Sequence, residues 1–409
     1  MLIKIAKHSF FLTSVAFVFS LYMVTRPLVT LDSYWVLPTT LSLLNEGNIN
    51  LDEFSAYGVG NSYAAIQIDN HFYNYFPYGI SFLIIPIVAI LNIFIPESFF
   101  FQYHGQIEKF CASLLILSSF FFLYNLFSFY ISKKKSAFLV VVMGLCTPLF
   151  TSGSRALWQH PGSVLLLSTS LFLLVSLMNR NVRAVPLLGI TLALSYVVRP
   201  TNAIPFLLIS LFVFYFFQEQ KWKYIAFSVA TLILFSIVNY INFGDFLPPY
   251  YRSSRLTFDW DVFKIAFLGN MFSPNRGLFV WSPVLLVFIL SIFVAKKERP
   301  IILLSLLIII FHFIAISLFP HWWGGHSVGP RFTTDIIPFF GLVLCLVWKR
   351  FQSNRIFFVS FLMLVVISFA VQFSAVISKK TQLWNIRGSD INEKPERVWD
   401  WNHPQFYPF

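Results

Sequence analysis

The stretch Leu31-Asp32-Ser33-Tyr34-Trp35 follows the first apolar run of the chain and begins a polar segment that continues to residue 75. The chain turns apolar again at Phe76-Pro77-Tyr78-Gly79, and almost everything after that point is apolar. Between the two quoted stretches lie further acids, namely Glu46, Asp52, Glu53 and Asp69. The sequence thus alternates between apolar segments and polar connections, and it places an acid where the first apolar helix would meet water.

The overall composition supports a membrane protein. Of 409 residues, 57% are hydrophobic, 11% are charged and 51 are phenylalanine, and the mean hydropathy is +0.73. This mixture lies far outside that of a soluble domain and predicts an all-α polytopic membrane protein. A net charge of +12 would suggest nucleic acid as a partner of a soluble chain, but here its distribution between loops is informative.

The apolar segments predict eleven membrane spans. The first follows Lys4 and Lys7 and has the character of an uncleaved signal anchor with its N-terminus inside. The expected spans are 9–24, 107–131, 137–153, 162–178, 185–199, 203–217, 224–242, 278–295, 300–319, 333–348 and 356–377.

One further apolar segment, 78–95, decides the orientation of every later loop. If it crosses the membrane, the five basic clusters around Lys134, Arg180, Lys221, Lys297 and Arg350 lie outside; if it lies along the outer face, they all lie inside. The second arrangement puts fifteen Lys and Arg residues and two acids inside, which gives a net charge of +13 there. It puts fourteen Lys and Arg residues and fifteen acids outside, which gives a net charge of −1. We therefore predict that 78–95 is an outer-face helix.

This topology predicts a single membrane domain, 1–378, with external loops at 26–106, 243–277 and 320–332 and an external tail, 379–409. Because fifteen of the seventeen acids lie outside, any chemistry is expected there. The spans carry little charge, His312 being the main exception, whereas a transporter more often has ionisable groups near the bilayer midplane.

Two external segments contain residues suited to a sugar phosphate. One is Ser273-Pro274-Asn275-Arg276-Gly277, and the other extends from His321 through Trp322, Trp323 and His326 to Arg331. Tryptophan stacks on sugar faces, and arginine binds phosphate with two hydrogen bonds. An interfacial aromatic belt with arginines on lipid headgroups is the alternative interpretation. Asp32 likewise has an alternative role as a helix cap.

The order of these motifs resembles the GT-C membrane glycosyltransferases, nearest to bacterial relatives of the protein O-mannosyltransferase and lipid A aminoarabinose transferase group. The stretches that carry the resemblance are Leu43-Leu44-Asn45-Glu46-Gly47, Pro77-Tyr78-Gly79, Arg155 to Pro161, the Ser273 to Gly277 segment and the Trp322 to Arg331 segment.

The resemblance implies an inverting, single-displacement transfer of a monosaccharide, hexose or pentose, from a polyprenyl-phosphate donor to an acceptor hydroxyl on the outer face. It makes Asp32 the base that takes the acceptor proton. The expected phosphate ligands are Arg331, Arg276, Arg155 and Arg199. The expected sugar or acceptor contacts are His160, Trp158, Trp322, Trp323, His326 and Tyr78.

The chain departs from that family at two motifs. Asp32-Ser33 stands where many relatives have Asp-Glu, and Gln159-His160-Pro161 stands where many have a second acid, so no metal or other cofactor is expected. The expected partners are the donor lipid, membrane lipids and a glycan, lipid or protein acceptor. The absence of an Asn-X-Ser/Thr sequon favours a bacterial inner membrane. A flippase for lipid-linked glycans and a non-catalytic assembly factor are the alternative functions.

Overall fold

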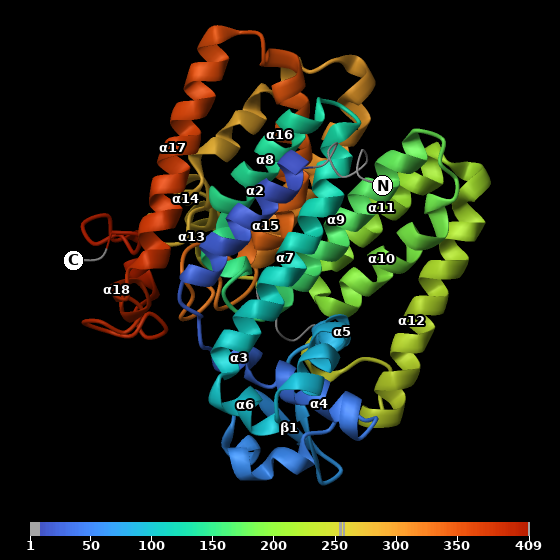
Figure 1. Ribbon diagram of the computed structural model, residues 1–409, viewed down its shortest axis with the longest axis vertical. Coiled ribbons are helices and arrows are strands. Elements are labelled where there is room, and N and C mark those ends of the chain that lie inside the picture. Colours follow the sequence, from blue (N-terminus) through green and yellow to red (C-terminus); the bar gives the residue numbers. More distant parts are fainter. Residues whose placement is uncertain (1–8, 253–255, 257, 408–409) are drawn as a thin grey trace.

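The computed structural model describes residues 9–252, 256 and 258–407, and Lys4 and Lys7 lie outside this range. A bundle of helices forms the upper part of the molecule in Figure 1, and a smaller layer of short elements closes its lower end. The helices of the bundle are α2 (Ser9–Val24), α7 (His104–Ser128), α8 (Lys133–Leu145), α9 (Gln159–Met178), α10 (Ala184–Val198), α11 (Ala203–Phe216), α12 (Lys221–Phe243), α14 (Leu278–Trp281) with η8 (Pro283–Phe293), α15 (Arg299–Ser317), α16 (Ile337–Phe351) and α17 (Arg355–Ile377).

This bundle confirms the all-α polytopic class. Six of its helical segments are long and apolar enough to cross a membrane, as judged by length and composition within the described residues. They are His104–Ser128, Gln159–Met178, Gln218–Phe243, Lys296–Ser317, Arg331–Phe351 and Arg355–Ile377. Each of the eleven expected spans coincides with a helical segment, although several are short, so the number of crossings stays a prediction.

Two expected spans are interrupted. The segment 137–153 consists of α8 followed by a π-helical turn, η3 (Leu149–Gly153). The segment 278–295 breaks at Ser282, whose φ of −139° and ψ of 64° are not helical, because the residue before a proline is disfavoured in the helical region. Pro283 then begins a 3₁₀ helix, η8.

The first external segment folds into the layer at the lower end. It contains α3 (Leu31–Tyr34), α4 (Val36–Asn45), η1 (Asp52–Tyr57), η2 (Val59–Asn61), the hairpin of β1 (Ala65–Ile68) and β2 (His71–Asn74), and α6 (Glu97–Gln102). The antiparallel strands pair Ala65 with Asn74 and Ile68 with His71. Asp69 and Asn70 form the turn with φ of 48° and 67°, as a two-residue hairpin requires.

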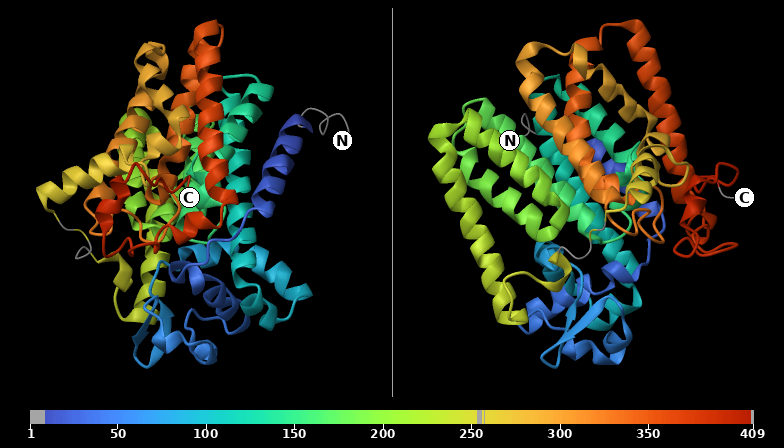
Figure 2. Two further views of the ribbon diagram at one scale, coloured as in Figure 1. Left: turned by 90° about the vertical axis from the view of Figure 1, so that its left-hand side faces the viewer. Right: turned by 180° about the vertical axis from the view of Figure 1, so that it is seen from behind.

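Helix α5 (Gly79–Phe94) lies as expected for 78–95. It belongs to the lower layer, where it packs on α4 through Ile80, Ile84 and neighbouring core residues, and does not rise into the bundle (Figures 1 and 2). Its first residue meets the end of α10 so closely that a Cβ on Gly79 would lie 2.5 Å from the carbonyl oxygen of Val197.

The basic clusters lie at the opposite end. The connections α7–α8, α9–α10 and α11–α12, the segment η9 (Lys296–Glu298) and the α16–α17 connection are all at the upper end in Figure 1. One face of the bundle is therefore strongly basic, and the acid-rich layer covers the other.

Two segments expected to be irregular contain helices. Within 243–277 lies α13 (Trp260–Phe272), capped by Asp259, whose side chain accepts from the backbone N–H groups of Asp261 and Val262. The tail contains α18 (Lys380–Leu383) and η11 (Pro395–Trp399). Asp259 is thus the N-cap of α13.

The orientation can be tested with added cysteines, because the native Cys111, Cys146 and Cys345 are all buried. Gln67 in the hairpin and Asn181 in the α9–α10 connection are exposed at opposite ends of the molecule. If the basic end faces the cytoplasm, an impermeant thiol reagent added to intact cells labels Gln67→Cys, and it labels Asn181→Cys only after permeabilisation. The reverse pattern would contradict the orientation, and wild type gives the background.

Candidate active site

Asp32 lies in α3, directly below the end of α2, and its carboxylate joins two distant parts of the chain. Arg331 donates from Nη2 to Oδ2 at 2.9 Å, and the Tyr63 hydroxyl donates to Oδ1 at 2.7 Å. The side chains of Asp32 and Arg331 are 23% and 11% exposed, so the ion pair is largely shielded and still reachable from solvent. Two residues singled out separately in the sequence therefore form one site.

Arg331 is held flat against an aromatic ring. Its guanidinium carbon lies 4.0 Å from the centroid of the Trp158 ring, and Trp158 is fixed by donation from Nε1 to the Thr30 hydroxyl at 2.8 Å. Among the described residues, the buried Nε of Arg331 has no hydrogen-bond partner, and Nη1 makes only a long contact of 3.5 Å to the Gly324 carbonyl. Arg331 therefore retains donor capacity for a ligand.

Tyr63 stays a donor beside this pair. Burial, and then the neighbouring Asp32 carboxylate, raise the pKa of Tyr63 well above its usual value. The phenol therefore remains protonated at neutral pH and fixes the orientation of Oδ1.

A second ion pair lies near the first, and Phe332 contacts both of their arginines. The Arg199 Nε lies 2.6 Å from Oδ2 of Asp335, and His160 donates from Nδ1 to the same carboxylate at 3.1 Å. Both guanidinium carbons face the Phe332 ring, Arg331 at 5.6 Å and Arg199 at 5.8 Å from its centroid. The two arginines thus lie near each other, and each has its own carboxylate partner, Asp32 for Arg331 and Asp335 for Arg199.

Arg155 and Tyr78 have different partners from those expected. Arg155 is 2% exposed, its Nε donates to the Arg26 carbonyl at 2.8 Å, and burial lowers its pKa to about 10. It anchors the segment that leads to Asp32. Tyr78 donates to the Asn239 side-chain oxygen at 2.5 Å and packs among Phe82, Phe235 and Phe243 in the core between α5 and α12.

Arg276 also differs from the expectation that it binds phosphate. All five of its N–H groups are used within the protein, at distances between 2.6 and 3.1 Å. The acceptors are the carbonyl oxygens of Trp323, Asn275 and Gly325 and the side-chain oxygens of Gln405 and Asn385. Burial, and then the charges of Arg331 and Arg397, lower its pKa to about 9.

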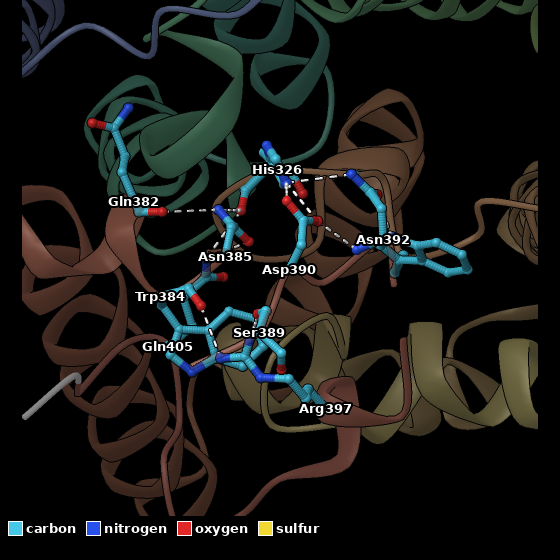
Figure 3. A network of polar contacts seen from close by, with 12 residues as sticks. His326, Gln382, Trp384, Asn385, Ser389, Asp390, Asn392, Arg397 and Gln405 are labelled. Atoms are coloured by element: carbon cyan, nitrogen blue, oxygen red, sulfur yellow. Dashed lines mark hydrogen bonds and ion pairs between the residues drawn. The ribbon is translucent and has the colours of Figure 1, made fainter. Parts of the chain in front are cut away.

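The remaining expected sugar contacts pack against the C-terminal tail. Trp322 and Trp323 are 4% and 7% exposed and share a small core with Trp384, Ile391 and Val398. His326 lies 2.9 Å from both carboxylate oxygens of Asp390, as Figure 3 shows. Their described contacts thus tie the 321–331 loop to the tail. The faces of Trp322 and Trp323 are not open in the way that a sugar platform requires, whereas the side chain of His326 is 44% exposed.

Three ionisable groups were not singled out in the sequence, namely Tyr63, Glu108 and Asp335. The expectation that His312 is the main ionisable residue within the spans is therefore wrong. Glu108 in α7 and Asp335 before α16 are each 1% exposed. An acid inside an apolar segment is costly unless it has a partner, so Asp335 was a signal that could have been used. His312, for its part, donates to the Phe332 carbonyl at 2.8 Å.

The expected absence of a metal remains a prediction. Within the described ranges, no three His, Cys, Asp or Glu side chains gather as a metal ion would require.

Comparison with known proteins defines the class by its fold. No protein-family model and no curated protein sequence matches the chain. The solved structures do contain a match, and it shows that the chain has a GT-C fold. The match is the crystal structure of ArnT, the lipid A aminoarabinose transferase, from Cupriavidus metallidurans bound to undecaprenyl phosphate, with a TM-score of 0.56 and 12% identity. It covers 92% of this chain and 67% of ArnT.

The buried ion pair generates a stability prediction. Asp335→Ala leaves Arg199 buried without its counter-ion, and breaking such a pair costs about 3–5 kcal/mol. We expect a large drop in the thermal unfolding midpoint of the purified protein in detergent. Asp261→Ala is the control, because Asp261 is 86% exposed and its pair with Lys264 is worth at most about 1 kcal/mol. Similar drops for both variants would contradict this assignment.

Proposed function

We propose that the protein is a glycosyltransferase that moves a monosaccharide from a polyprenyl-phosphate donor to an acceptor hydroxyl at the outer membrane face. The observation that carries the proposal is the Asp32–Arg331 contact of 2.9 Å, which joins a candidate base to a candidate phosphate ligand. A fold shared with ArnT, which was crystallised with undecaprenyl phosphate, supports the same substrate class.

When the donor binds, its phosphate replaces Asp32 as the partner of Arg331. A phosphate offers the guanidinium two parallel charge-assisted hydrogen bonds, in place of the described bond from Nη2 of Arg331 to Asp32. The unpartnered Nε of Arg331 is available for the second of these bonds. Arg199, which lies next to Phe332, adds positive charge close to the phosphate while Asp335 holds it in place.

Once Arg331 binds the donor phosphate, Oδ2 of Asp32 acts as the catalytic base. The acceptor hydroxyl gives its proton to Oδ2 while its oxygen forms a bond to the anomeric carbon of the sugar. The bond from that carbon to the phosphate oxygen breaks on the opposite face, and its electron pair stays on the polyprenyl phosphate, whose charge Arg331 stabilises. Attack from the face opposite to the leaving group inverts the anomeric configuration. Tyr63 keeps Oδ1 oriented throughout.

The alternative functions are less well supported. A flippase needs a hydrophilic path across the bilayer. The buried carboxylates Glu108 and Asp335 instead lie within the first two turns at the outer ends of their helical segments. We further propose that the membrane is a bacterial inner membrane with the tail outside, and that the acceptor is a glycan, lipid or protein of the cell envelope.

The activity can be tested by sugar transfer in reconstituted membranes, with a pool of polyprenyl-phosphate sugars as donors and cell-envelope extract as acceptor. Asp32→Asn should reduce transfer by about 10²–10⁴-fold, because it removes the base. Asp69→Asn, a change in the hairpin turn where Asn is also tolerated, is the matched control. Equal transfer by wild type and Asp32→Asn would remove Asp32 as the base. Labelled lipid on the opposite leaflet, without transfer, would favour the flippase.

The phosphate site can be tested separately by binding of undecaprenyl phosphate to the purified protein. Arg331→Ala should weaken binding by about tenfold or more, because a hydrogen bond to a charged group is worth about 1.5–3 kcal/mol. Arg331→Lys should restore only part of the affinity, since lysine cannot bind two oxygens in a plane. Arg252→Ala is the control, because Arg252 is 65% exposed. Unchanged affinity in Arg331→Ala would exclude Arg331 as the phosphate ligand.

A further inference from the structure

The C-terminal tail, 379–407, is folded against the external loops of the bundle. Trp384, Ile391 and Val398 form its apolar core together with Trp322 and Trp323 of the 321–331 loop. Arg397 ties the tail to itself by donation from Nη2 to the Trp384 carbonyl at 2.9 Å, with its guanidinium carbon 4.6 Å from the Trp384 ring centroid (Figure 3). The tail is therefore a defined structural unit.

Two buried amide side chains of the tail hold the backbone of the 321–331 loop. Gln405 accepts from the Gly329 N–H at 3.0 Å and donates to the Ser327 carbonyl at 3.0 Å. Asn385 donates to the same Ser327 carbonyl at 3.1 Å. Both side chains are at most 1% exposed, so water does not compete for these bonds.

Arg276 completes the same network from the bundle side. It donates to the loop carbonyls of Trp323 and Gly325 and also to the side-chain oxygens of Gln405 and Asn385. The guanidinium thus lies between the loop and the tail and binds both. This arrangement explains why a cation in a conspicuous external motif has no donor left for a phosphate.

The loop needs such support because it has no regular structure of its own between α15 and η10 (Arg331–Ile336). Gly324, Gly325 and Gly329 have φ of 74°, 60° and 67°, a region that favours glycine. A Cβ on Gly329 would lie 2.7 Å from the Trp281 ring, so the backbone passes very close to α14. Polar backbone groups in such a path must be satisfied by side chains.

We infer that the tail is a clamp that positions Arg331. Asn385 and Gln405 act as positioning residues through the 321–331 loop, whose last residue is Arg331, two positions after the Gly329 N–H that Gln405 binds. Arg276 lies at the centre of this clamp, because its guanidinium donates to both the loop and the tail. The inference rests on the proposed function in one respect only, namely that Arg331 holds the donor phosphate.

The test compares Gln405→Ala with wild type in reconstituted membranes by two independent measurements. The first is amide hydrogen exchange of residues 322–331. The second is the affinity for undecaprenyl phosphate together with the donor KM and kcat. We expect faster exchange of these amides, an affinity about tenfold lower and a donor KM about tenfold higher, with kcat changed much less, because buried hydrogen bonds that orient a binding residue are lost.

His403→Ala is the control, because His403 is 67% exposed and pairs with Asp400 inside the tail. Asn385→Ala removes a different bond to the same Ser327 carbonyl and must act in the same direction. It also replaces Gln405→Ala if that variant fails to fold.

Unchanged exchange in both variants would overturn the clamp. Faster exchange with full affinity for undecaprenyl phosphate, where Arg331→Ala has lost it, would overturn its action on Arg331. If wild type and Arg331→Ala bind undecaprenyl phosphate equally, the proposed phosphate site fails, and the exchange measurement still decides whether the tail holds the loop.

Discussion

An ionised group cannot be left without a partner where water is scarce, and this constraint organises the outer end of the molecule. All five N–H groups of Arg276 donate to protein oxygens, and Arg199 is paired with Asp335. Arg155 donates to the carbonyl of Arg26, in the segment that precedes Asp32. Arg331 is shielded as well, but its Nε lacks a partner within the described residues, and its carboxylate partner is partly exposed. The number of N–H groups that have protein partners therefore distinguishes Arg331, which can still bind a ligand, from Arg155, Arg199 and Arg276, which hold the surrounding structure.

Local sequence signals were sufficient for the class of fold and for choosing Asp32 and Arg331 as candidate site residues. Hydropathy and loop charge each depend on a short window, so the helical bundle, the position of α5 outside it and the basic end opposite the acid-rich layer could be predicted. Asp32 and Arg331 could be chosen because each stands beside a span in a motif with Gly, Pro or Trp. Their contact could not be predicted, since 299 positions separate them in sequence.

The roles of the other candidate residues depend on tertiary contacts, which cannot be read from a short stretch of sequence. An arginine among Gly and Pro residues suits a phosphate or a set of carbonyls equally well, and only the packing of Asn385 and Gln405 around Arg276 distinguishes the two. The same holds for Trp322, whose ring would suit a sugar but packs against Gly269, where a Cβ would lie 2.5 Å from it. Asp335 is the exception, because an acid in an apolar segment was visible in the sequence.

The site draws on segments from almost the whole chain, and this has a consequence for its assembly. Asp32 and Tyr63 come from the first external segment, Trp158 and His160 from the start of α9, and Arg331 from the loop that Gln405 holds. Contacts between such distant segments form only after the intervening helices have packed. The bonds that hold the 321–331 loop are therefore complete only when the tail, which follows the bundle in the sequence, has docked on that loop. A folded bundle without a docked tail would still contain Asp32 and Arg331 but would lack the bonds that fix their geometry.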